Sequence, residues 1–326
     1  MGLRWGIMAP GGIAAIFAQD LLATNRSLLA VGSRSQARAE EFAARYAIPR
    51  VHGSYEALAE DPEIDAIYIA SPHTEHAANA ELALRNGKHI LVEKPFTLTG
   101  AQARRVRAVA RETGLFAMEA MRTRFMPHSL RMHELIAEGA LGEIRALTAD
   151  HCQRLNPDPQ GRLWNPALGG GALLDLGIYN VAFASDFLGT PKDVTAAAIM
   201  TETGVDRSTA MIFRYEGGAM ASLQTAMDAR GTNRAAIIGT EARLEVASVF
   251  YKSSRFQLIG GKDEVLEDFS QPYPFWGKQF EAEEVERCVA AGITQSPRMS
   301  LDESVAIAET MDRVREKIGL VYPAEL

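Results

Sequence analysis

The sequence predicts an α/β protein of two domains, the first built on a parallel sheet and the second on a mostly antiparallel one. Three observations lead to this fold class. The chain has 326 residues, a length typical of about two domains. Its first third alternates short apolar runs with stretches of helical periodicity. Its second half carries apolar runs joined in pairs by short turns, a pattern typical of hairpins.

The first third has the pattern of consecutive βαβ units. Residues 35–46 and 99–113 are expected to be two of its helices. The runs expected to be strands are residues 3–8, 28–33, 65–70, 89–92 and 115–120. Strands separated by helices form parallel sheets, and such sheets bind ligands beyond the carboxyl ends of their strands. We therefore expect the loops that follow these strands to share one crevice.

The pattern changes after Met121. Residues 127–138 and 172–188 are expected to be helices, with the polar, proline-containing stretch 154–166 as a loop between them. Three hairpins are expected, pairing residues 210–215 with 219–226, 235–239 with 243–246, and 255–259 with 264–266. Hairpins in series form an antiparallel sheet, unlike the sheet of the first third.

Two further helices, 276–291 and 301–318, are expected at the end of the chain. The change of pattern predicts a first domain of residues 1–121 and a second of residues 122–326. The last helix is a candidate to pack back on the first domain.

The composition is that of an ordinary globular protein, with 47% hydrophobic and 23% charged residues. The net charge of −7 argues against a nucleic-acid partner. The sequence shows no run of 18 apolar residues and no signal-peptide pattern after Met1, so we expect no membrane contact and a cytoplasmic location. Cys152 and Cys288 are too few for a disulfide framework, and no zinc spacing is present, so no metal site is expected.

The turn after the first predicted strand has the place and composition of a dinucleotide-binding fingerprint. It reads Ala9-Pro10-Gly11-Gly12-Ile13, and a helix is expected to follow it directly. Gly11 allows the backbone to approach a pyrophosphate, which the helix N-terminus would attract. Ala9 replaces the first glycine of the usual motif. A plain turn between strand and helix is the alternative interpretation.

The end of the second predicted strand favours NADP over NAD. NAD-binding folds place a carboxylate here, about 20 residues after the glycine turn, where it bonds the ribose 2′-hydroxyl. This chain has Ser33-Arg34-Ser35 instead, with two hydroxyls and a guanidinium that suit a 2′-phosphate. The alternative is that Arg34 stacks on adenine and that either cofactor is accepted.

Two further motifs carry chemistry. Glu93-Lys94-Pro95 ends the fourth predicted strand and would place a lysine in the crevice; a salt-bridged loop lysine is the alternative. Three consecutive glycines, Gly169–Gly171, precede a helix on which Asp175 and Tyr179 lie four positions apart, hence on one face. An acid and a phenol on an apolar helix need partners. They are either functional residues or a hydrogen-bonded pair in the core.

These segments resemble one protein family. The stretches WGIMAPGGIA, SPHTEHAANAELALRNGKHILVEKPFTLT and GGGALLDLGIY, in this order, are similar to the glucose–fructose oxidoreductase / inositol dehydrogenase (Gfo/Idh/MocA) family. MEAMRTRF resembles the branch with dihydrodiol dehydrogenases and NADP-dependent xylose dehydrogenases, which often has tryptophan where this chain has Arg122. The resemblance implies a Rossmann domain, a second domain with an open sheet, and homodimers or homotetramers formed through that sheet.

The resemblance also implies an activity and the residues that perform it. The expected enzyme is an NAD(P)-dependent oxidoreductase that moves a hydride between nicotinamide and a hydroxyl or carbonyl carbon of a sugar, cyclic polyol or dihydrodiol. Lys94 is implied as catalytic, with Tyr179 as acid/base and Asp175 orienting the substrate. A nearby ammonium would lower the phenol pKa, which is ordinarily about 10. The alternatives are a keto-sugar reductase and a catalytically silent NADP-sensing regulator.

Two sets of residues complete the predicted site. The loop after the third strand is implied to lie near the nicotinamide ribose, so its residues are expected to face the cofactor rather than a metal. The cofactor-facing set adds Ser71, His73, His76 and Glu93 to those named above. The candidate substrate-contacting residues are Arg122, Phe125, His151, Arg162 and Trp164. Each of the latter could equally be a packing or surface residue.

Overall fold

The computed structural model describes residues 2–325, and their contacts divide the chain into two compact units. The first unit runs to Arg122 and also contains Pro274–Val305. The second comprises Thr123–Tyr273 and the residues from Ala306 onward. This corrects the predicted partition at one segment, because Pro274–Val305 had been assigned to the second domain. Its apolar and polar pattern is that of an ordinary helix and does not reveal which sheet it packs on.

The first unit is a Rossmann fold with a parallel sheet. Within residues 2–325 this sheet has six strands in the order β3-β2-β1-β4-β5-β6, all parallel to their neighbours. The strands are β1 Arg4–Met8, β2 Ser27–Gly32, β3 Arg50–His52, β4 Ala66–Ile69, β5 His89–Glu93 and β6 Ala117–Ala120. Every residue of β4 and β6 is buried, as expected for strands covered on both faces.

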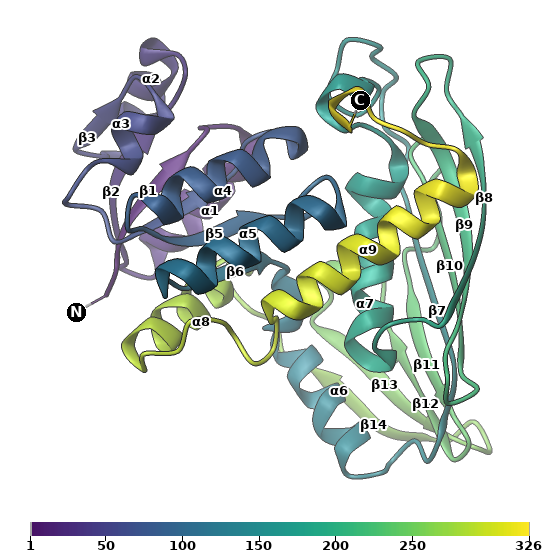
Figure 1. The fold of residues 1–326 in the computed structure, drawn as a ribbon. Coiled ribbons are helices and arrows are strands. Elements are labelled where there is room, and N and C mark those ends of the chain that lie inside the picture. Colours follow the sequence, from purple (N-terminus) through teal and green to yellow (C-terminus); the bar gives the residue numbers. More distant parts are fainter. Residues whose placement is uncertain (1, 326) are drawn as a thin grey trace. The chain divides into compact units, whose positions relative to one another are not determined.

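Helices connect these strands and cover the sheet (Figure 1). They are α1 Gly12–Ala23, α2 Gln36–Tyr46, α3 Tyr55–Ala59, α4 His76–Arg85 and α5 Gly100–Thr113. The segment Pro274–Val305, which returns to the first unit and is called the returning segment below, adds helix α8, Gln279–Ala290. Helix α8 packs on α1. The returning segment also contacts the edge strand β6, whose Ala117 amide donates to the Thr294 carbonyl at 3.2 Å. The parallel-sheet prediction is confirmed, and the short strand β3 is an addition to it.

The second unit is built on one large, mostly antiparallel sheet. In the described part of the chain it has eight strands in the order β14-β13-β12-β11-β7-β10-β9-β8. The strands are β7 Ile144–Cys152, β8 Asp193–Met200, β9 Asp206–Arg214, β10 Met220–Ala226, β11 Ala235–Gly239, β12 Ala242–Val246, β13 Arg255–Gly260 and β14 Val265–Ser270. The three predicted hairpins are present as β9–β10, β11–β12 and β13–β14. Strand β7 pairs in parallel with β10, so the sheet is mixed.

Helices lie on one face of this sheet, and the opposite face is open within the described residues (Figure 1). The helices are α6 Pro127–Ala137 and α7 Ile178–Leu188, followed by the part of α9 (Leu301–Ile318) from Ala306 onward. Strand β10 shows the consequence, since buried and exposed side chains alternate along it. The segment Pro166–Leu188, which contains α7, is 23 residues long and apolar enough to cross a membrane by length and composition. However, 78% of its most apolar window is buried, as in the core helix of a globular unit.

The helix predicted over residues 172–188 is not uniform. Residues Leu173–Gly177 form a π-helical turn before α7 begins at Ile178. A π-helical turn is rare and is found most often at functional sites. Here it contains Asp175, one of the residues expected to act in the site.

Candidate active site

The predicted functional residues fall into two groups, one in each unit, and each group is described by itself. In the first unit, the turn between β1 and α1 has the geometry of a dinucleotide site. Ala9 has φ of +72°, the left-handed conformation that glycine favours, and so occupies the place of the missing glycine. Gly11 caps α1 without a side-chain bond, and the space around it is open: a Cβ at Gly11 or Gly12 would meet no described atom within 4 Å. The free helix N-terminus and the open space fit a pyrophosphate.

The three residues after β2 are arranged to donate hydrogen bonds. Ser33 Oγ accepts from the Ser35 amide at 3.1 Å, and Ser35 Oγ caps α2 by accepting from the Arg38 amide. Both hydroxyls therefore act locally as acceptors, and their O–H groups are able to donate to an anion. Arg34 is exposed, with its guanidinium 6.0 Å from the centre of the Tyr55 ring. This set fits the 2′-phosphate of NADP.

The loop after β4 corrects the prediction for His76. This histidine is fully buried, with Nδ1 2.8 Å from the Pro95 carbonyl and Nε2 2.9 Å from the Ser71 carbonyl. Both ring nitrogens are engaged, so the ring joins the loops after β4 and β5 instead of facing a cofactor. Burial lowers the pKa of His76, opposed by these two carbonyls. Ser71 and His73 are also buried, and the Ser71 hydroxyl accepts from the Asn79 amide at 2.9 Å.

Glu93 ends strand β5 and Lys94 follows it, and their side chains have different surroundings. The Glu93 carboxylate is buried, bonded by the Tyr68 hydroxyl and the Lys278 ammonium, so the prediction that it faces the cofactor is wrong. Lys94 is only half-buried, and its amide donates to Glu93 Oε2 at 3.3 Å. The buried bonds of Glu93 therefore fix the backbone that carries Lys94. Lys94 itself lies at the carboxyl end of a parallel strand, where ligands bind.

Arg122 is also part of the interior of the first unit rather than a free substrate-contacting group. It is 8% exposed, and its Nη1 donates to the Trp276 carbonyl at 2.6 Å. It thereby holds the returning segment, a role that the sequence does not reveal because the partner lies 154 residues away. Phe125 and Trp164, both of the second unit, are 4% and 8% exposed and offer little surface to a ligand.

In the second unit, the glycine turn packs closely against a loop of the protein itself. A Cβ on Gly170 would lie 2.7 Å from the carbonyl oxygens of Arg162 and Leu163. Gly171 has φ of +111°, donates its amide to the Leu163 carbonyl at 2.8 Å, and lies against Asp206. The close approach that these glycines permit is therefore to the loop that carries Arg162.

This packing brings Arg162 to Asp175. Arg162 Nη2 donates to Asp175 Oδ1 at 2.9 Å, and the Asp175 side chain is 14% exposed. Arg162 was predicted to contact substrate, and in the structure it also orients the carboxylate of the π-helical turn. The carboxylate oxygens of Asp175 also accept hydrogen bonds, so the bonded guanidinium fixes an acceptor for a substrate hydroxyl.

Tyr179 belongs to a cluster of aromatic rings with His151 and Tyr251. The ring centre of Tyr179 lies 5.3 Å from that of His151 and 4.9 Å from that of Tyr251, while His151 and Tyr251 are 3.9 Å apart. Gln153 ties the cluster together, because its amide bonds His151 Nε2 at 2.8 Å and the Tyr251 hydroxyl at 2.9 Å. Gln153 and Tyr251 were not predicted, since neither lies in a recognisable motif.

Both ring nitrogens of His151 are hydrogen-bonded within the protein. Nδ1 lies 3.0 Å from the Leu176 carbonyl, which only accepts, so Nδ1 carries the proton. Nε2 then accepts from the Gln153 amide. His151 is 1% exposed and both of its ring nitrogens are bonded within the protein, so it supports the ring cluster and offers no surface to a substrate. The predicted contact between His151 and substrate is corrected accordingly.

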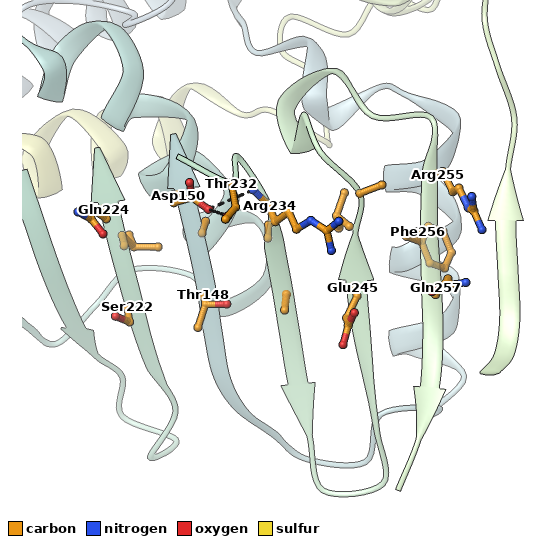
Figure 2. Close-up of a pocket in the computed structure, with 16 residues that line it drawn as sticks. Thr148, Asp150, Ser222, Gln224, Thr232, Arg234, Glu245, Arg255, Phe256 and Gln257 are labelled. Atoms are coloured by element: carbon orange, nitrogen blue, oxygen red, sulfur yellow. Dashed lines mark hydrogen bonds between the residues drawn. The ribbon is translucent and has the colours of Figure 1, made fainter. Parts of the chain in front are cut away.

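A separate hollow of about 480 Å³ lies on the open face of the large sheet (Figure 2). Its lining is polar and comes from β7, β10, β12, β13 and the start of β11, and Figure 2 shows Asp150 bonded to Thr232. The labelled side chains that line it are Thr148, Asp150, Ser222, Gln224, Thr232, Arg234, Glu245, Arg255, Phe256 and Gln257. The hollow thus contains none of the predicted site residues. Residues 2–325 also hold no cluster of three or more His, Cys, Asp or Glu side chains able to bind a metal.

Two family models match the chain. The model described as "Oxidoreductase family, NAD-binding Rossmann fold" covers residues 3–121, and the model described as "GFO/IDH/MocA C-terminal domain" covers residues 129–245. Each model thus matches the larger part of one of the two units. Fold and site therefore define an NAD(P)-dependent oxidoreductase that acts on CH–OH groups.

The chain belongs to the Gfo/Idh/MocA family. It is 36% identical over 331 residues to the trans-1,2-dihydrobenzene-1,2-diol dehydrogenase of Danio rerio, covering 99% of this chain and 98% of the relative. The enzyme of the same name from Mus musculus is 34% identical, covering 100% and 99%. Among solved structures, a 3-ketoreductase from Actinomadura kijaniata in complex with NADP and TDP-benzene is 30% identical with a TM-score of 0.86, covering 98% of both chains. The predicted family and branch are confirmed.

Proposed function

We propose that this protein is an NADP-dependent dehydrogenase that oxidises one hydroxyl of a vicinal diol on a six-membered ring, with trans-dihydrodiols as the first substrate class and cyclic polyols and sugars as the wider one. The observation that carries the proposal is the half-buried Tyr179, held by the buried rings of His151 and Tyr251, on the same helical stretch as the Arg162–Asp175 pair. The Tyr179 ring is suited to packing on the face of an apolar ring, and a carboxylate accepts a hydrogen bond from a diol hydroxyl.

Tyr179 and Lys94 divide the acid–base work in this proposal. Tyr179 takes the hydroxyl proton as the hydride leaves the same carbon, and Lys94 donates a hydrogen bond to the oxygen on which negative charge develops. Asp175 accepts from the neighbouring hydroxyl and so orients the ring, while Arg162 holds that carboxylate. The bound nicotinamide supplies the hydride acceptor. Gly11 and the N-terminus of α1 would hold its pyrophosphate, and Ser33, Arg34 and Ser35 its 2′-phosphate.

An oxidation screen tests the proposal. Racemic trans-dihydrodiols, inositols and aldoses are each offered with NADP and with NAD, and NAD(P)H formation is followed by absorbance. The expected result is turnover with NADP that is fastest for the dihydrodiols. Binding of NADPH without turnover of any substrate would contradict the proposal and identify the protein as a silent NADP-sensing regulator.

Reduction of a keto-sugar is the second candidate, supported by the 30% identity to a 3-ketoreductase. Hydride transfer is reversible, so the same residues serve both directions. The two candidates are separated by the ratio of kcat/KM values for a dihydrodiol with NADP and a keto-sugar with NADPH. A ratio in favour of the keto-sugar would replace the first candidate by the second.

We also propose that a second copy of the chain covers the open face of the large sheet, as a homodimer or within a homotetramer. Supporting observations are the exposed apolar side chains of the neighbouring strands β8, β9 and β10, namely Ile199, Ile212 and Met220, which are 54%, 40% and 49% exposed. Contiguous exposed apolar surface is typical of protein interfaces. Light scattering after size exclusion is expected to show an oligomer that dissociates in the Ile212→Asp variant. A monomeric unaltered protein would contradict this assignment.

A further inference from the structure

A cluster of buried charges lies behind Lys94, entirely within the first unit. Glu93, Lys278 and Glu281 are 5%, 4% and 0% exposed. The Lys278 ammonium bonds Glu93 Oε1 and also Glu281 Oε2, the latter at 3.2 Å, and the Tyr68 hydroxyl donates to the same oxygen of Glu93. The other oxygen of Glu93 accepts from the Lys94 amide at 3.3 Å. A continuous path of polar contacts therefore runs from Glu281 through Lys278 and Glu93 to Lys94.

The cluster holds two carboxyl groups and one ammonium, so its charge is not balanced when both acids are ionised. Buried charges are tolerated only when they are paired. Removing one partner leaves the other charge uncompensated, which strongly destabilises the fold. Glu281 is the less well paired acid, because its Oε1 has no hydrogen-bond partner among the described residues. When the single ammonium is bonded to Glu93, Glu281 therefore favours its protonated form.

Other charged groups face the cluster from the surrounding elements. The positive charge of Arg122 acts to lower the pKa of both Glu281 and Lys278. Asp20 of α1 accepts from the Lys278 amide at 2.8 Å, and His76 of α4 and Lys94 interact with Glu93. Burial opposes ionisation of Glu93, but the charge of Lys278 and the bonds from Lys278 and Tyr68 outweigh it and lower the pKa. Burial raises the pKa of Glu281 to about 7 in spite of Lys278.

We propose that Lys278 and Glu281 are positioning residues of the hydride-transfer reaction, because they fix the carboxylate of Glu93 and, through it, the backbone from which Lys94 reaches the substrate. The proposal rests on the role of Lys94 given above. With Glu281 protonated, the ammonium is committed to Glu93 and the three groups sum to zero charge. With Glu281 ionised, the ammonium is shared, the sum is −1, and Glu93 is held less firmly. Lys94 is therefore best placed on the acidic side of the Glu281 ionisation.

The variant Glu281→Gln tests this, because it keeps the size of the side chain and removes its ionisation. The kcat of the unaltered protein is expected to carry an ionisation near pH 7 that the variant lacks. The ratio of kcat at about pH 8.5 to kcat at about pH 6 is then several-fold higher in the variant. The Kd for NADPH, measured by fluorescence, is expected to stay the same, since neither residue is placed in the cofactor turn.

A matched control is Glu283→Gln on the same helix. Glu283 is 46% exposed and paired with Arg26, so its replacement is expected to leave the pH profile of kcat as it is. Lys278→Met removes the only cation bonded to the two acids in the described structure and is expected to lower kcat strongly at every pH. If that variant does not fold, the Glu281→Gln profile decides alone.

Two failures are distinguishable. If Lys94→Ala lowers turnover but Glu281→Gln has the unaltered pH profile, the positioning proposal is wrong and the proposed function stands. If Lys94→Ala has full turnover, the role of Lys94 is wrong and the positioning proposal falls with it. A change in thermal stability without a change in the pH profile would make the cluster purely structural and would overturn the proposal.

Discussion

The two units bury acidic side chains behind their functional residues in different ways. In the first unit, Glu93 and Glu281 share the ammonium of Lys278. In the second, Asp206 lies under the glycine turn, where Oδ2 accepts from the Leu173 amide at 2.8 Å and from the Thr209 hydroxyl at 2.7 Å. Burial raises the pKa of Asp206 to about 7. The supply of a bonded cation, more than burial itself, therefore decides which buried acid stays ionised.

The two units also differ in how they form a tight turn. In the cofactor turn, Ala9 takes a left-handed conformation in a place where the neighbouring glycines have open space. In the second unit, Gly171 takes a similar conformation, but a Cβ there would lie 2.2 Å from Asp206 Oδ1. The first turn is shaped to admit a ligand, and the second to pack on the protein itself.

The largest expected effect removes one proposed catalytic side chain from each unit. Lys94→Ala and Tyr179→Phe are each expected to lower kcat by about 10²–10⁴-fold, the range typical of a positioned acid–base group. The Kd for NADPH is expected to change far less. Steady-state kinetics and fluorescence titration measure both quantities. Turnover of Tyr179→Phe close to that of the unaltered protein would remove Tyr179 from the acid–base role.

Gly171→Ala is expected to lower the free energy of unfolding by roughly 3 kcal/mol, from backbone strain together with the displacement of the Asp206 carboxyl. Gly217→Ala is the control, because a Cβ at Gly217 meets no described atom within 4 Å. Urea denaturation of both variants measures the difference. Equal stabilities would mean that the glycine turn tolerates a side chain and that the contrast between the two turns is wrong.

Asp206→Asn tests the buried acid of the second unit that shares no bond with a cation within residues 2–325. The raised pKa of Asp206 means that its contribution to stability is fully present below its unfolded pKa of 3.8 and is lost as the pH rises through about 7. An amide keeps the two accepted hydrogen bonds and does not ionise. We expect the variant to be more stable than the unaltered protein by roughly 2–3 kcal/mol at about pH 8, with little difference at about pH 4. Parallel losses of stability with pH in both proteins would exclude this role.

Arg34→Ala sharpens the assignment of the cofactor turn. Loss of a charge-assisted bond to a 2′-phosphate is expected to raise the KM for NADP by about tenfold or more and to leave that for NAD nearly constant. Kinetics with both cofactors measure the change. Similar effects on the two KM values would show instead that Arg34 contacts the adenine.

Ala9→Gly is expected to have the smallest effect. Glycine relieves the left-handed strain of about 1–2 kcal/mol but adds freedom to the unfolded chain, so a net gain of about 0.5 kcal/mol is expected. Thermal denaturation without cofactor measures it. A loss of stability would mean that the Ala9 methyl group makes packing contacts that outweigh the strain.

Local patterns predicted the elements that depend on local chemistry. The hairpin between β9 and β10 follows from Gly217-Gly218, because Gly218 takes φ of +83° in the turn. Strand β3 was missed because three residues are too few to show a period. The π-helical turn was missed for a different reason: an apolar run with acid and phenol four apart looks the same in a π-helix as in an α-helix.

The candidate site was predictable where it rests on motifs and not where it rests on distant partners. Lys94, Asp175 and Tyr179 lie in recognisable stretches. Glu281 and Lys278, in contrast, have the spacing of an ordinary exposed ion pair on a helix, and only the tertiary fold shows that both are buried. The same holds for Asp206, which begins a strand like many exposed acids.

The bond between Glu93 and Lys278 also concerns the synthesis of the protein. The two residues are 185 positions apart, and a ribosome needs roughly 10–40 s to add that many residues. During this time the nascent Rossmann strands contain an acid whose cation does not yet exist, so the first unit is completed only after nearly all of the second has been made. A nascent chain in this state exposes unfinished structure to proteases and chaperones. A fragment that ends near Met121 would remain in that state permanently.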